Sequence, residues 1–175
     1  IVLNNQIYSG AHGMAGEIGW AVIKDLPEEE NIELVSLNRK AAVVSGLCFN
    51  YNNEKLKENA DFTPVDDAEE IFKQEANGEK IAHQVVENFF TDLAIGLINT
   101  ISFFDPEAIL IGGGISNNEE FQERLQLRLR EVKARHESLN RITPLIDTPV
   151  IMAKLKNDAG LLGATYQIKQ RIENS

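Results

Sequence analysis

The chain has 175 residues, a formal net charge of −10 and one cysteine. Its length fits one domain with a core, or one lobe of a larger protein. No apolar run could span a bilayer, and one cysteine excludes an internal disulfide or a thiolate metal cage. The acidic balance argues against nucleic-acid binding by this segment, because such binding relies on clustered Lys and Arg. A free cysteine suits the cytoplasm.

The first residues predict a β-hairpin over Ile1 to Tyr8, with Asn4-Asn5 at the turn, because asparagine tolerates the left-handed conformation. The chain starts without a methionine and without a preceding element that would complete a sheet. We therefore expect residues 1–175 to be the C-terminal lobe of a longer protein whose N-terminal lobe is absent from this chain.

A glycine-rich stretch follows from Ser9 to Trp20, and Glu17 is its only carboxylate. Glycines give such a loop access to positive φ and let a ligand approach the backbone closely. One interpretation is a tight connection between the hairpin and a strand over Ile18 to Ile23. The other is a loop that binds a polyol, since an ionised carboxylate accepts hydrogen bonds from neighbouring hydroxyls.

The middle of the chain is predicted to be helical. Ser36 caps a helix over about Leu37 to Cys48, and Phe49 to Asp61 is a short helix or an irregular loop. Asp66 opens a further helix with capping-box spacing. From Glu79 a wide apolar stripe predicts a central helix of about 24 residues. Its second half, Leu93 to Phe104, is expected to be buried on both sides.

The last third alternates strands and helices. Pro106 ends the long helix, and Ala108 to Ile111 is an apolar run typical of a strand covered on both faces. Gly112-Gly113-Gly114 could bring backbone close to a nucleotide or could serve close packing. Ser116 opens a capped helix, and a strand over Val150 to Ala153 precedes a last helix.

Three segments together resemble the ROK family of bacterial sugar kinases and sugar-responsive repressors. They are Gly10 to Gly19, Asp105 to Ser116 and Asn157 to Ala164. The resemblance implies an actin-like, ribonuclease-H-like α/β lobe. We expect one mixed sheet built from the hairpin, Ile18 to Ile23, Ala108 to Ile111 and Val150 to Ala153, with the long helix packed on it.

The resemblance also implies site residues. The glutamate that matches Glu17 contacts the sugar in the family, and His12 stands where the family usually has asparagine. The expected nucleotide-binding residues are Gly112, Gly113 and Gly114. The expected sugar-binding residues are Gly10, His12, Gly13, Gly16, Glu17, Gly19 and Trp20.

Two departures from the family pattern affect chemistry. Trp20 replaces the histidine of zinc-containing members, and no cysteine lies between Trp20 and Ser45, so we predict no metal site. Trp20 could instead stack on a sugar ring, or belong to the core. Ala41 stands where a second sugar-binding glutamate is usual. Its loss would cost roughly 1.5 to 3 kcal/mol of sugar binding.

Two functions compete. In the first, the chain is the sugar-binding and oligomerisation domain of a ROK-type transcriptional regulator. In the alternative, it is the C-terminal lobe of an ATP- and magnesium-dependent sugar kinase. The two departures favour the regulator. Because the family's catalytic aspartate and phosphate-binding turn would lie upstream, we assign this chain no catalytic residue and expect no phosphoryl transfer from it. Expected partners are a sugar or sugar phosphate and a second copy of the chain, and neither nucleic acid nor a membrane.

Overall fold

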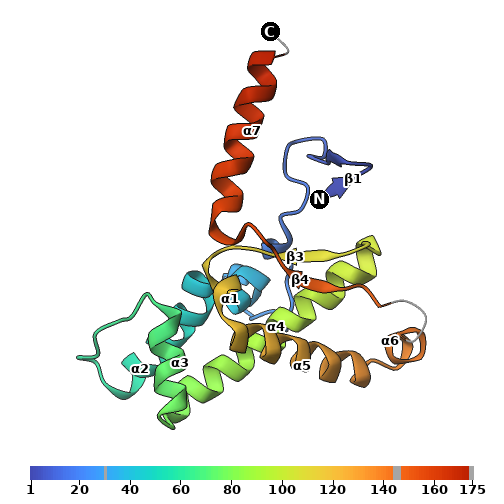
Figure 1. Ribbon diagram of the computed structural model, residues 1–175. Coiled ribbons are helices and arrows are strands. Elements are labelled where there is room, and N and C mark those ends of the chain that lie inside the picture. Colours follow the sequence, from blue (N-terminus) through green and yellow to red (C-terminus); the bar gives the residue numbers. More distant parts are fainter. Residues whose placement is uncertain (30, 144–146, 174–175) are drawn as a thin grey trace. The chain divides into compact units, whose positions relative to one another are not determined.

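The computed structural model describes residues 1–29, 31–143 and 147–173. The chain forms two compact units, Ile1–Thr100 and Ile101–Ser175. The long helix α4, Lys80–Phe104, runs from the first unit into the start of the second (Figure 1). No helix in the described ranges is both long and apolar enough to cross a membrane.

The predicted hairpin is confirmed. Strands β1 (Val2–Leu3) and β2 (Gln6–Ile7) pair in antiparallel fashion. Asn4 and Asn5 form the turn with φ of 52° and 60°, the left-handed region that favours asparagine among non-glycine residues.

The predicted strand over Ile18 to Ile23 is wrong. Residues Ile18–Trp20 form the 3₁₀ helix η1, because their backbone donors find acceptors locally. Trp20 N–H donates to Glu17 at 3.2 Å and Ala21 N–H donates to Ile18 at 3.0 Å. Among the described residues, the β pairing of the segment 18–23 consists of one isolated bridge between Val22 and Ser36. A second 3₁₀ helix, η2 (Ile32–Val35), follows the polar loop.

Ser36 caps a helix as predicted, and its hydroxyl accepts the Arg39 N–H at 3.5 Å. This helix, α1, covers only Leu37–Ala41, because Ala42 is extended at ψ 158°. The chain continues as the π-helix η3 (Val43–Cys48) and then as α2 (Phe49–Glu58). The expected continuous helix from 37 to 48 is therefore broken at Ala42.

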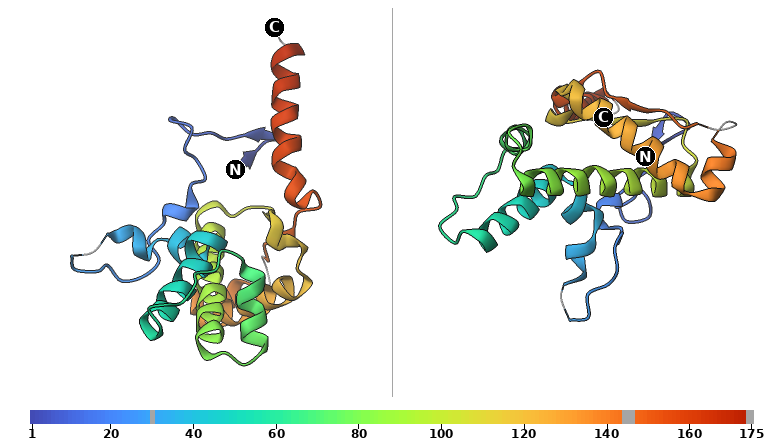
Figure 2. Two further views of the ribbon diagram at one scale, coloured as in Figure 1. Left: turned by 90° about the vertical axis from the view of Figure 1, so that its left-hand side faces the viewer. Right: turned by 90° about the horizontal axis from the view of Figure 1, so that it is seen from below.

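The buried side chains of the first unit follow α4 from Ala82 to Ile98. Figure 2 draws this helix and the helices that precede it in the chain from two sides. Helix α3 (Ala68–Ala76) precedes α4 and is capped by Asp67, one residue later than predicted. At the start of α4 the Glu79 carboxylate accepts the Ala82 N–H at 2.8 Å. The apolar stripe of α4 is buried as expected through its middle. Its buried apolar members are Ala82, Val85, Val86, Phe89, Phe90, Ala94, Leu97 and Ile98.

The last turn of α4 departs from the prediction. Phe103 is 76% exposed and Phe104 is 49% exposed, because no described segment covers them. Asp105 then leaves the helix with φ 41°, and Pro106 cannot continue it.

The second unit is built on a parallel pair of strands, β3 (Ile109–Ile111) and β4 (Val150–Met152). Leu110 is 66% exposed, so the expected cover on both faces is absent among the described residues. The expected single mixed sheet is likewise not formed in the described ranges, where two separate two-stranded sheets occur. The strand expected over Ile18 to Ile23 is absent from both sheets, because Ile18–Trp20 is helical and Val22 makes an isolated bridge.

Helices follow each strand of this unit. After β3 come η4 (Gly114–Asn117), α5 (Glu119–Arg135) and α6 (Glu137–Ile142). After β4 come η5 (Lys156–Asp158) and α7 (Ala159–Glu173). Asn118 caps α5 by accepting the Phe121 N–H at 2.9 Å. The predicted cap, Ser116, instead donates its hydroxyl to Gly113.

Candidate functional site

The glycine-rich stretch is an exposed loop in the first unit. Ala15 N–H donates to Ser9 at 3.1 Å and closes it. Gly10, Gly13 and Gly16 have φ of 72°, 75° and 98°, which L-residues with a Cβ rarely adopt. Three of the four glycines are therefore required by the conformation of the loop.

Glu17 lies at the end of this loop, as the N-cap residue of η1, and its side chain makes no capping hydrogen bond. The residue is exposed. Within the described ranges its carboxylate has no ion-pair partner. The loop therefore presents one carboxylate whose acceptor capacity is available to a ligand.

The other predicted loop residues lie close by in the chain and at the surface. His12 is exposed. Trp20 is 61% exposed, so the core role considered for it is not seen in the first unit. Its indole is available for stacking. All seven residues predicted from the sequence lie between Gly10 and Trp20, where they are exposed or partly exposed.

Helix α1 packs against η1, and this places Ala41 on a neighbouring element of the same unit. Leu37 N–H donates to Ala21 at 2.8 Å, and a Cβ on Gly19 would lie 3.4 Å from that of Asn38. No carboxylate comes from position 41 itself. Of the loop residues and position 41, Glu17 therefore supplies the one carboxylate.

The residues of this region do not fit a zinc ion. Trp20 offers no free lone pair, and the single cysteine, Cys48, is buried at 1% exposure in η3. His12 is the one imidazole of the loop, and no cysteine lies between Trp20 and Ser45 to supply the thiolates of a structural zinc site.

The second glycine cluster, Gly112 to Gly114, lies in the other unit after β3. Gly113 has φ 87° and its carbonyl accepts the Ser116 hydroxyl at 2.6 Å. A Cβ on Gly113 or Gly114 would meet no described atom within 4 Å. Close packing is therefore not the reason for these two glycines among the described residues, whereas the backbone conformation is a reason for Gly113.

A buried ion pair fixes the segment that follows the loop. Lys24 Nζ lies 2.5 Å from Asp92 Oδ1, and the Asp92 side chain is 4% exposed in the middle of α4. Burial raises the pKa of Asp92, while Lys24 and then Lys40 act in the opposite direction. Sequence reasoning missed this pair. Its only signal was a carboxylate inside the apolar stripe of a buried helix.

A cavity of about 680 Å³ opens beside this ion pair, entirely within the first unit. Its walls come from η2, α1, η3, α2 and α4. Its lining residues are Lys24, Val35, Lys40, Leu47, Asn50, Glu54, Lys80, Ile81, Gln84, Val85, Asn88, Phe89 and Asp92.

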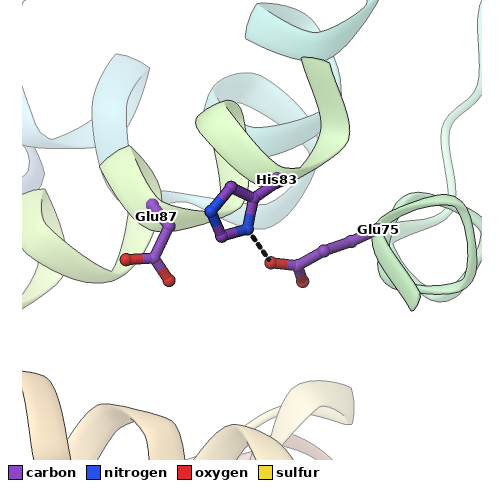
Figure 3. Close-up of side chains that lie close together, drawn as sticks. All are labelled: Glu75, His83 and Glu87. Atoms are coloured by element: carbon purple, nitrogen blue, oxygen red, sulfur yellow. Dashed lines mark hydrogen bonds and ion pairs between the residues drawn. The ribbon is translucent and has the colours of Figure 1, made fainter. Parts of the chain in front are cut away.

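Among the residues that the structure describes, one cluster of possible metal ligands occurs, and it lies in the same unit. His83 and Glu87 project from α4 and Glu75 projects from α3 (Figure 3). His83 Nδ1 lies 3.1 Å from Glu75 Oε1, and one ligand atom from each residue lies within 4.8 Å of the others. Both carboxylates also take part in other interactions. We therefore describe the cluster as a contact between α3 and α4 and assign no metal to it.

The sequence matches the ROK family over residues 1–171. The chain belongs to the ROK family.

Individual relatives agree with this assignment. An uncharacterised protein of Clostridium perfringens is 29% identical over 97% of this chain and 51% of its own length. A β-glucoside kinase of Listeria monocytogenes is 37% identical over 58% of this chain and 31% of its own length. The chain thus spans about half the length of the relatives that it matches throughout.

Solved structures show the same fold. A ROK family protein from Streptococcus pneumoniae in complex with sucrose superposes with a TM-score of 0.77 at 23% identity, over 99% of this chain and 54% of its own. A ROK family glucokinase from Streptomyces griseus in complex with glucose and AMPPNP gives 0.68 at 20% identity, over 94% and 54%. The predicted ribonuclease-H-like fold class is confirmed by these neighbours.

Proposed function

We propose that this chain is the sugar-binding lobe of an ATP-dependent sugar kinase. The observation that carries the proposal is Glu17, an exposed carboxylate at the end of a glycine loop that has no ion-pair partner among the described residues. The names of relatives support the kinase over the regulator, since a β-glucoside kinase and an N-acetyl-D-glucosamine kinase are among them. The proposal reverses the preference that the sequence alone suggested.

The chemistry assigned to the loop is recognition. Glu17 accepts hydrogen bonds from two neighbouring hydroxyls of the sugar, and a charged acceptor strengthens each bond. The positive-φ glycines leave the backbone uncovered at the loop, so a sugar ring can approach it. Trp20 offers an aromatic face for stacking on the ring.

Phosphoryl transfer requires groups that this chain does not supply by itself. Gly112 to Gly114 offers backbone for a nucleotide but no carboxylate, so the turn does not fit a magnesium site on its own. The general base that takes the proton of the attacking hydroxyl would come from another part of the protein. The lobe on its own is therefore expected to be inactive.

The effector-binding domain of a regulator is the second candidate, and Ala41 favours it. A sensor needs only a difference in sugar affinity between two states, whereas a kinase must also orient one hydroxyl for attack. Losing the second glutamate is therefore less costly to a sensor. A homodimer is part of both candidates, and light scattering tests it.

Calorimetric titration with glucose and with sucrose tests the site. We expect saturable binding of one of them, and Glu17→Gln should weaken it by roughly ten- to a hundred-fold. Glu28→Gln, an exposed change of the same charge in the loop before η2, is the matched control and should leave affinity unchanged. Equal affinity in both variants would contradict the assignment of Glu17.

A coupled assay with ATP and magnesium separates the two candidates. Turnover by a protein that contains this lobe together with a partner lobe supports the kinase. Saturable sugar binding without turnover in the same protein supports the regulator.

A further inference from the structure

The cavity of the first unit is distinct from the glycine loop, because none of residues 9–20 lines it. The apolar part of its lining that solvent reaches comes from Val35 and Ile81, which are partly exposed, and from Val85 at 6% exposure. A volume near 680 Å³ is within the range of small-molecule sites. It therefore has room for a ligand with an apolar part.

The charged groups of the cavity are unevenly paired. Asp92 is paired with Lys24 at 2.5 Å, and Glu54 is paired with Lys57 at 2.6 Å, so both carboxylates have cations. Lys40 and Lys80 also line the cavity, and among the described residues neither forms an ion pair with a carboxylate. Lys40 and Lys80 thus line one cavity without forming a close ion pair among the described residues, although Lys40 also interacts electrostatically with Asp92, in a chain whose net charge is −10.

The neutral polar groups of the wall add donors. Asn88 accepts a hydrogen bond from Gln84 Nε2 at 3.1 Å through its Oδ1, which leaves its NH₂ group to donate. Lysine ammonium groups also only donate. The wall therefore matches a ligand that carries acceptors and negative charge.

We propose that this cavity is a second binding site, which takes a small organic anion whose phosphate or carboxylate contacts Lys40 and Lys80 and whose apolar part lies on Val35, Ile81 and Val85. The site is independent of the proposed sugar contact at Glu17. The site lies on α1 and α4. Its ligand therefore contacts α1, which packs on η1, and α4, which carries Asp92, the ion-pair partner of Lys24.

Nuclear magnetic resonance titration of the purified protein tests this with four probes. Phenyl phosphate has both features, phenylacetate exchanges phosphate for carboxylate, inorganic phosphate lacks the apolar part, and benzyl alcohol lacks the charge. We expect phenyl phosphate or phenylacetate to bind several-fold more tightly than either of the other two. The stronger of the two anions identifies the charged group. Shifts should concentrate on the cavity lining.

The double variant Lys40→Ala/Lys80→Ala should weaken binding of the preferred anion about ten-fold, and added salt should weaken it in the wild type. Lys73→Ala/Lys169→Ala is the matched control, because both side chains are exposed and lie outside the cavity. Glu17→Gln should leave this affinity unchanged, which separates the site from the sugar loop.

Three results would overturn the proposal. They are equally tight binding of benzyl alcohol, equally tight binding of inorganic phosphate, and an unchanged affinity in the lysine double variant. A fourth result would also overturn it, namely the absence of saturable binding of both organic anions at about 10 mM. If the double variant loses helical structure, the exposed single change Lys80→Gln takes its place, with an expected loss of about three-fold.

Discussion

The Lys24–Asp92 pair predicts that its two members differ in their importance for stability. Removing Lys24 by Lys24→Met leaves the buried Asp92 carboxylate without its close partner. Breaking a fully buried pair in this way costs about 3 to 5 kcal/mol. Because the Lys24 side chain is 42% exposed and water screens the pair, we reduce the expected cost to about 1 to 3 kcal/mol.

The opposite change should be nearly neutral. Asp92→Asn removes a buried charge, keeps the shape and releases Lys24 to water, so we expect the free energy of unfolding to stay within about 1 kcal/mol of wild type. The double variant should resemble Asp92→Asn. Urea denaturation followed by circular dichroism measures all three. A larger decrease in the free energy of unfolding for Asp92→Asn than for Lys24→Met would refute the reasoning.

The pH dependence of the same variants has a defined sign. Burial raises the pKa of Asp92 above 3.8 in the folded chain. Stability linked to this proton is present below the unfolded pKa and is lost as pH rises through the folded pKa. Asp92→Asn should therefore gain stability relative to wild type as pH rises from 3.8 through that window. An unchanged difference across the window would contradict the raised pKa.

Two further predictions concern the packing around α1 and α2. Gly46→Ala should destabilise the first unit by about 1 to 3 kcal/mol in urea denaturation, because the added Cβ would lie 3.1 Å from Ala41 N and 3.2 Å from the Asn38 carbonyl. A variant as stable as wild type would show that the π-helix can shift to accommodate the Cβ at little cost. Burial raises the pKa of Tyr51 from 10.0 to about 12, so the free energy of unfolding of the wild type should fall as pH rises across that range. Tyr51→Phe should remove part of this fall. The same dependence on pH in both proteins would count against the raised pKa.

The sequence correctly predicted the elements that depend only on residues close together in the chain. The Asn4-Asn5 turn and the Ser36 cap depend on one or two residues and their own backbone, so the sequence identifies them. Asp67 and Asn118 cap their helices in place of Asp66 and Ser116. In both cases several capping residues stand side by side, and tertiary packing decides which one starts the helix.

Other features depend on residues far apart in sequence. The apolar residues of 18–23 resemble a strand, yet a strand needs a partner, and the neighbouring chain at Ser36 turns at once into α1. Lys24 and Asp92 meet only because the loop returns to α4. The glycine loop could be predicted as a candidate site because all its residues are consecutive. The cavity could not, since its wall comes from five elements.

The single cysteine gives this protein a built-in reporter of local opening. Cys48 lies at the end of the π-helix with 1% exposure, and burial raises the pKa of its thiol. A disulfide reagent reacts with the exposed thiolate, so the folded state is protected twice, by occlusion and by protonation. The rate of labelling in native buffer therefore follows how often η3 separates from α1 and α3, the helices that it contacts. Because no second thiol competes, the free energy of that opening can be measured without introducing any label site.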